Sequence, residues 1–180
     1  VQPPQASTHT DGLDTGNRSQ ILMAVTVDSL VAGVHFPTQT PPEWVAHKAL
    51  AVNLSDLAAM GAQPVSITLG LVLPDWDTHW LQAFSSGLSK LYHRWNLQLI
   101  ACDVRKGPLS VTVQAHGQVN EKNALLRSRA RPGEQIFVSG TLGDAACALP
   151  YYLAHKSLPE PYLDFLQQRF NCPEPRLDVA

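Results

Sequence analysis

Three aspartates are the side chains of this sequence best suited to bind a cation or to orient a phosphate. Asp28 ends the nearly continuous apolar run 21–27, Asp103 comes shortly after the short predicted strand 97–100, and Asp56 lies inside an apolar stretch. An acid in such surroundings is costly to bury without a partner. If the strands and the helix that carry these acids meet, the three carboxylates converge on one site.

Each of these residues also has a simpler structural explanation. Asp28 is as well placed to cap a turn as to hold a metal, and both interpretations stay open. Asn53 and Asp56 are three residues apart, so they share one face of a helix, where solvation or local hydrogen bonding is the simpler explanation. The further aspartates elsewhere in the chain favour a shared site for Asp56.

The stretch 49–62 is predicted to be the second half of a helix. Thr40 is expected to cap the start of this helix, Pro41 and Pro42 fit its first turn, and Gly61 fits its end. Apolar residues recur with helical spacing, so one face of the helix must pack on a core.

The remaining pattern alternates strands with helices. Strands are predicted at 21–28, 65–73, 97–100, 109–117 and 135–138, and helices at 78–95 (capped by Asp77), 144–155 and 160–170. Residues 1–20 are predicted to form a flexible loop. Because some strands are consecutive, we expect an α+β fold, a mixed sheet with helices on one face, rather than a doubly wound α/β fold.

Composition narrows the class of protein. The 180 residues are 44% hydrophobic and 16% charged, enough apolar material for a sizeable core. A formal charge of −2 argues against nucleic acid or an anionic membrane as a partner. Three widely spaced cysteines without a CxxC pair favour a reducing cytoplasm over disulfides or zinc, and no apolar run approaches the ~20 residues of a membrane helix.

Several stretches, in this order, resemble the thiamine-monophosphate kinase family. They are Thr26–Phe36, Lys48–Ala62, Asp103 with Lys106–Ser110, and Arg127-Ser128 with Pro132-Gly133. This family belongs to the superfamily of aminoimidazole ribonucleotide synthetase, selenophosphate synthetase and a hydrogenase-maturation factor. The Asn-Leu-Ser-Asp helix is typical of the superfamily, and the stretch at Asp28 points to the thiamine enzyme.

The resemblance implies transfer of a phosphoryl group from ATP to thiamine monophosphate, with Mg²⁺, in the cytoplasm. Phosphoryl transfer needs positioning and cations, and Mg²⁺ prefers oxygen ligands. By resemblance, the metal site comprises Thr26, Val27 (through its backbone), Asp28, Asp56 and Asp103. By resemblance also, Cys102, Asp103 and Arg127 contact the nucleotide, and His35 contacts the substrate.

The resemblance also implies a domain organisation. Residues 21–150 correspond to an N-terminal ATP- and magnesium-binding domain that dimerises through a shared β-barrel, and 151–180 to the start of a truncated C-terminal domain. The chain begins without Met, so we expect both ends to be cut from something longer.

Three departures from the family pattern accompany this match. The family's Gly-Asp-Asp motif is absent, its Gly-Gly-Asp-Thr motif appears as Ala101-Cys102-Asp103-Val104, and its second domain is missing. We therefore expect little kinase activity from these residues alone. Two alternatives stay open: another synthetase of the superfamily, and a non-catalytic homologue that serves as a dimerisation module.

Overall fold

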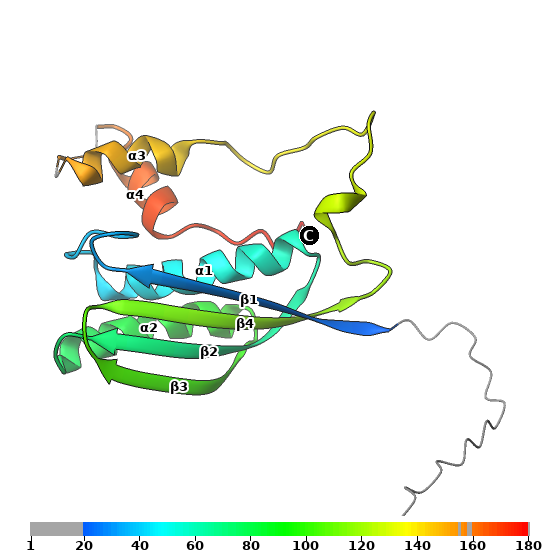
Figure 1. Ribbon diagram of the computed structural model, residues 1–180. Coiled ribbons are helices and arrows are strands. Elements are labelled where there is room, and N and C mark those ends of the chain that lie inside the picture. Colours follow the sequence, from blue (N-terminus) through cyan, green and yellow to red (C-terminus); the bar gives the residue numbers. More distant parts are fainter. Residues whose placement is uncertain (1–19, 155, 158–159, 180) are drawn as a thin grey trace, which may run out of the picture.

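A mixed four-stranded sheet organises the described part of the chain (Figure 1). The computed structural model describes residues 20–154, 156–157 and 160–179, so nearly all of the predicted loop at 1–20 lies outside the described residues. The strands are β1 (Ile21–Val31), β2 (Gln63–Leu73), β3 (Gln98–Lys106) and β4 (Ser110–Asn120), in the spatial order β1-β4-β2-β3. Strand β4 is antiparallel to β1 and β2, and β3 is parallel to β2.

Two helices, α1 (Pro42–Ala59) and α2 (Thr78–Arg94), cover one face of this sheet (Figure 1). The apolar stripe of α1 is fully buried, as its helical spacing predicted. Leu50 and Leu54 share one core with Val113 of β4. The α+β class, with a mixed sheet and helices on one face, is confirmed.

The other face of the sheet is exposed along β1. Alternate side chains of a strand point to opposite faces, and the first four of β1 that point away from the helices are apolar. Their exposed fractions are 59% for Ile21, 60% for Met23, 49% for Val25 and 63% for Val27. We call these four residues the open face.

A smaller helical unit follows the sheet. It contains the 3₁₀ turn η1 (Arg127–Arg129) and the helices α3 (Asp144–Leu153) and α4 (Leu163–Asn171). Ala148 and Phe170 belong to a second, small hydrophobic core that holds α3 against α4.

The chain that leaves α4 returns to the first two helices. Arg94 Nη1 donates to Glu174 Oε2 at 3.0 Å, and His47 Nε2 lies 3.0 Å from the carbonyl oxygen of Pro173. Leu177 packs against the main core. These contacts tie the helical unit to α1 and α2.

Most predicted elements are present in the structure. The side chain of Asp77 accepts hydrogen bonds from the backbone N–H groups of His79 and Trp80, so its predicted capping role is confirmed. Gly61 has a φ of +67°, a left-handed conformation that favours glycine where a helix ends.

The predicted cap of α1 is wrong. The N-cap residue is Pro41, and no side chain caps the helix. Thr40 lies one residue before the position from which a side chain reaches the free N–H groups of the first turn.

The predicted strand at 135–138 is also wrong for the described residues, where this segment belongs to no sheet. Ile136 is 94% exposed and Phe137 is 84% exposed, so no neighbour offers the backbone partner that a strand requires.

Of the helices in the described ranges, none combines the length and the apolarity needed to cross a membrane.

Candidate functional site

Strand β1 and helix α1 bring two of the three predicted acids together. We call the place where Thr26 and Asp28 of β1 meet Asp56 of α1 the seam. Asp28 is one of the alternate β1 residues that point toward the helices, and Asp56 lies in the last turns of α1. Partial burial raises the pKa of the Asp28 carboxyl, the negative charge of Asp56 raises it further, and His35 lowers it. The two carboxylates are therefore close enough to repel each other.

A buried hydrogen bond joins β1 to α1 next to this seam. Thr26 Oγ1 donates to Asn53 Oδ1 at 3.0 Å, and Asn53 Nδ2 donates to the carbonyl oxygen of Ala49 at 3.0 Å. Asn53 is fully buried. Because Asn53 and Asp56 share a face of α1, this bond sets where the Asp56 turn meets β1.

Removing the Thr26 hydroxyl should destabilise the fold. In Thr26→Val the buried Asn53 Oδ1 loses this donor, and we expect the free energy of unfolding to fall by about 1–3 kcal/mol. Urea unfolding followed by circular dichroism measures the loss. Thr26→Ser keeps the hydroxyl and should cost distinctly less, so equal losses in the two variants would contradict the role of the bond.

Asp103, the third acid, lies on the opposite face of the sheet. It is in register with Gly70, Gly70 with Thr112, and Thr112 with Ser29. Residues in register across a sheet point to the same face, whereas Asp28, the neighbour of Ser29, points to the other. The expected convergence of three acids therefore does not occur within one chain.

Two details of that expectation are corrected. Asp28 and Asp103 lie inside strands rather than after them, because β1 continues to Val31 and β3 continues to Lys106. Within the described ranges, no three His, Cys, Asp or Glu side chains gather in a way that would hold a metal ion. The Asp103 carboxylate instead lies 3.1 Å from Arg105 Nη2 in an exposed ion pair.

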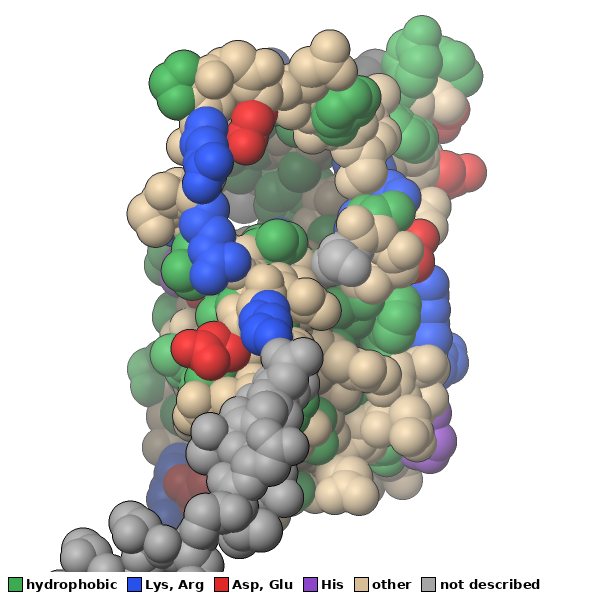
Figure 2. Space-filling view, turned by 90° about the vertical axis from the view of Figure 1, so that its right-hand side faces the viewer, with side chains coloured by type: hydrophobic (Ala, Val, Ile, Leu, Met, Phe, Trp, Pro, Cys, Tyr) green, Lys and Arg blue, Asp and Glu red, His purple; other side chains and the backbone are tan. Residues whose placement is uncertain are grey.

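The predicted nucleotide contacts are spread over the molecule. Cys102 points toward α2, where it lines an apolar groove with Leu69 and Phe84, and burial raises the pKa of its thiol. Arg127 is exposed in η1. Figure 2, a view of the side that carries η1, shows Lys and Arg side chains following one another along one border of that face.

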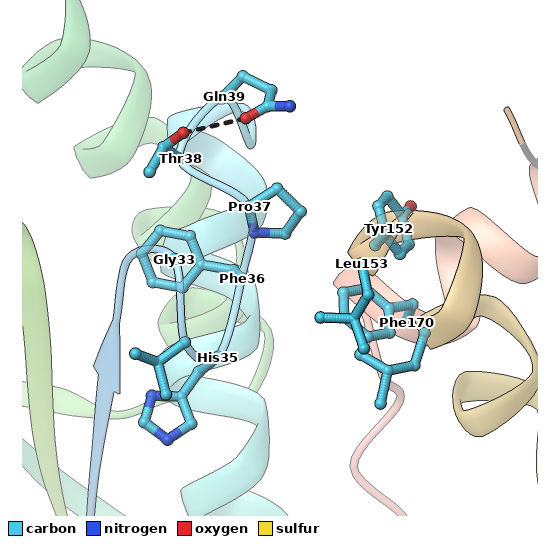
Figure 3. Close-up of a pocket in the computed structure, with 11 residues that line it drawn as sticks. Gly33, His35, Phe36, Pro37, Thr38, Gln39, Tyr152, Leu153 and Phe170 are labelled. Carbon is cyan, nitrogen blue, oxygen red and sulfur yellow. Dashed lines mark hydrogen bonds between the residues drawn. The ribbon is translucent and has the colours of Figure 1, made fainter. Parts of the chain in front are cut away.

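A pocket of about 290 Å³ lies between the loop 33–39 and the helices α3 and α4 (Figure 3). His35 and Phe36 line it from the loop, and Tyr152 and Phe170 face them from the helical unit. The mostly apolar and aromatic walls suit a flat ring. We call this cavity the loop–helix pocket.

His35, the predicted substrate contact, is positioned by its own loop. The backbone N–H of Val31 donates to His35 Nδ1 at 2.9 Å. Nδ1 is therefore the acceptor nitrogen, and Nε2 carries the hydrogen of the neutral ring. His35 can offer that N–H to an anionic group of a ligand.

The donor set of the seam fits a hard cation. Asp28 and Asp56 supply carboxylate oxygens whose mutual repulsion a cation would relieve. The Thr26 oxygen keeps lone pairs while its hydrogen is donated to Asn53. The side chain of Val27 is on the open face, so only its backbone can take part. Oxygen ligands of this kind suit Mg²⁺.

Curated proteins similar to this chain are kinases. Thiamine-monophosphate kinase of Escherichia coli (strain K12) is 46% identical over 156 residues, which are 86% of this chain and 48% of that protein. Thiamine-monophosphate kinase of Haemophilus influenzae is 43% identical over 158 residues, 88% of this chain and 48% of that protein. The chain spans about half the length of the curated relatives it matches.

Solved structures share the fold. The crystal structure of thiamine-monophosphate kinase from Stenotrophomonas maltophilia K279a has a TM-score of 0.84 at 42% identity and covers 91% of this chain and 53% of that chain. The structure named AaThiL complexed with AMPPCP and TMP has a TM-score of 0.80 at 32% identity, over 87% of this chain and 50% of that chain.

One family profile matches most of the sheet. The match, to "AIR synthase related protein, N-terminal domain", covers residues 14–119, more than half of the 180 residues. It contains β1 to β3 and both helices that cover them, with Asp28, Asp56 and Asp103. This chain belongs to the family of AIR synthase related proteins, as an N-terminal domain.

Proposed function

We propose that this chain is the N-terminal part of a thiamine-monophosphate kinase, which transfers a phosphoryl group from ATP to thiamine monophosphate and forms thiamine diphosphate in the cytoplasm. One observation carries the proposal: the chain is 46% identical to such a kinase over 156 residues. The closeness of Asp28 to Asp56 in an oxygen-rich seam supports it. The three free thiols suit a reducing compartment.

The seam is the metal-binding part of the proposed site. Asp28 and Asp56 hold Mg²⁺ through their carboxylates, with Thr26 and the backbone of Val27 beside them. When bound, Mg²⁺ supplies the positive charge that the transferred phosphoryl group needs. The chain's own contribution is to hold these oxygens in place through the Thr26–Asn53 bond.

A second copy of the chain completes the proposed site. In one chain, Asp103 is three strand spacings away from β1, on the order of 14 Å, and on the wrong face. The open face and the free edges of β1 and β3 suit pairing with another sheet, because apolar faces and unpaired edges need cover. A homodimer with a shared barrel brings the partner's β3 toward β1, and Asp103 of the partner subunit toward the seam.

The nucleotide and the substrate then occupy neighbouring positions. Asp103 and the backbone of Cys102 meet the phosphates of ATP, and Arg127 adds a positive charge. Thiamine monophosphate places its rings in the loop–helix pocket, and His35 Nε2–H donates to it. The phosphate of thiamine monophosphate then points toward the seam, because His35 lies near Asp28.

A further domain is part of the proposal. The exposed segment 135–138 and helix α3 form a strand-like piece followed by a helix, and this unit lacks a sheet among the described residues. We place the start of the second domain near residue 131, earlier than the boundary at 151 suggested by the sequence. The strand forms when the rest of that domain supplies its partner.

Activity of single and mixed variants tests the site. In the whole protein, Asp56→Asn and Asp103→Asn should each lower the rate of thiamine diphosphate formation by about 100-fold or more, because each removes a charge from the metal site. An assay of thiamine diphosphate by chromatography measures the rate. Undiminished activity of Asp56→Asn would remove Asp56 from the metal site.

Mixing the two inactive variants tests whether the site is shared. A hybrid dimer of Asp56→Asn and Asp103→Asn contains one site with both substitutions and one with neither, if Asp103 acts across the interface. Unfolding and refolding the two variants together should then restore a substantial part of the activity. If both acids act within one chain, every site of the hybrid carries a substitution and the mixture stays inactive.

A non-catalytic dimerisation module is the second candidate. Ala101 and Cys102 put side chains where the family pattern has glycines, which narrows the approach of a phosphate to the backbone. This candidate predicts a dimer of the whole protein that fails to bind ATP in the presence of Mg²⁺. Glycine at both positions should then restore nucleotide binding.

A further inference from the structure

Lys48 contacts both walls of the loop–helix pocket. Its side chain comes from α1. Lys48 Nζ donates to the carbonyl oxygen of His35 at 3.2 Å, and the same atom lies 3.7 Å from the centre of the Phe170 ring. His35 belongs to the loop wall and Phe170 to the helical wall (Figure 3). One ammonium group therefore joins two segments far apart in the sequence.

The helical wall is built so that this contact is transmitted. The ring of Phe170 is buried and stacks on Tyr152 with a distance of 4.5 Å between ring centres. The hydroxyl of Tyr152 accepts a hydrogen bond from Asn171 Nδ2 at 2.8 Å. Because Phe170 is on α4 and Tyr152 is on α3, this stack joins the two helices.

The charge of Lys48 is sensitive to pH. Burial lowers the pKa of Lys48 to about 8, and the neighbouring Cys172 raises it. Glu43 acts on Cys172, His35 faces Lys48 through its carbonyl, and Tyr152 lies behind the Phe170 ring. A neutral amine still donates a hydrogen bond, but it loses the attraction between a cation and the face of an aromatic ring.

We propose that Lys48 is a positioning residue, whose ammonium group holds the loop 33–39 and helix α4 at the separation that accepts a flat ring. The identity of the ring as that of thiamine monophosphate rests on the proposed function. The joining of the two walls by Lys48 does not depend on the proposed function. Lys48 touches neither reacting atoms nor metal ligands in this assignment. It acts through His35 and Phe170.

Ligand binding at two pH values tests the proposal. Calorimetry on the whole protein compares the affinity for thiamine monophosphate at pH 7 and pH 9. The wild-type affinity should fall by about 3- to 10-fold at pH 9, the size of a lost cation–π contact. Lys48→Arg keeps its charge at both pH values, so its affinity should change little between them. Lys48→Met should bind thiamine monophosphate weakly at both pH values. An affinity of the wild type that does not change with pH would overturn the role of the charge.

A second measurement works without any ligand. Hydrogen exchange of the backbone amides in 33–39 and 163–171 reports how firmly the two walls are held. At pH 7 both segments should exchange faster in Lys48→Met than in the wild type or in Lys48→Arg. Equal exchange in all three proteins would overturn the proposal. If the exchange differs as expected but thiamine monophosphate fails to bind the wild type, the proposed function is at fault instead.

A matched control separates Lys48 from its titrating neighbour. Cys172→Ala removes the thiol but leaves the contacts of Lys48 with His35 and Phe170. The fall in affinity between pH 7 and pH 9 should persist in this variant. Its disappearance would assign the pH dependence to Cys172 and remove it from Lys48.

Discussion

The substitution Val25→Asp should convert the proposed homodimer into monomers. Val25 lies at the centre of the open face, where Met23 and Val27 flank it on the same side of β1. In a symmetric dimer the substitution places two carboxylates in one apolar interface. An unpaired charge there costs several kcal/mol, so the dissociation constant should rise by about 100-fold or more. Sedimentation velocity over a range of protein concentrations measures this shift.

The same substitution elsewhere provides the control. Val179 is 60% exposed near the end of the described chain and is not part of the open face. Val179→Asp should leave the dissociation constant unchanged. If Val25→Asp and Val179→Asp behave alike, the open face is not the dimer interface. In that case Asp103 of the partner subunit has no route to the seam either.

The substitution Gly87→Val should have the largest effect on folding. A Cβ atom at position 87 of α2 would lie 2.5 Å from both Cα and the carbonyl oxygen of Glu43 on α1. Alanine and valine both have a higher helix propensity than glycine. Here backbone blocks the space, so α2 must move away from α1. We expect a loss of about 3 kcal/mol or more in the free energy of unfolding.

An adjacent position separates packing from helix propensity. Ser86 precedes Gly87 on α2 and is exposed. Ser86→Val should change the free energy of unfolding by only a few tenths of a kcal/mol, since its side chain meets solvent. Thermal unfolding of both variants gives the comparison. A similar small loss in Gly87→Val would mean that the two helices are not closely packed at this point.

Local patterns in the sequence determined most of the elements. The Asp77 cap and the Gly61 stop each depend on neighbours within a few residues, and each is present in the structure. The same patterns identified Asp28 and Asp56 as candidate acids. Local signals of this kind are carried by backbone geometry, which is why they can be predicted without a fold.

Elements that depend on distant partners were decided by the tertiary structure. The apolar segment 135–138 has the composition of a strand, but a strand exists only where another backbone accepts and donates its hydrogen bonds. Asp103 shows the same limit. Its acid was identified from the sequence, but the register of β3 with β2 decided that it points away from the helices.

The loop–helix pocket depends entirely on the fold. Lys48 and Phe170 are separated by most of the domain in sequence, and no spacing rule relates an ammonium group on one helix to a ring on another. The sequence by itself determined which side chains are able to bind a cation, a phosphate or a ring. Packing between α1 and α4 and the register of the strands decided which of these side chains meet. Both act between residues that are not neighbours along the chain.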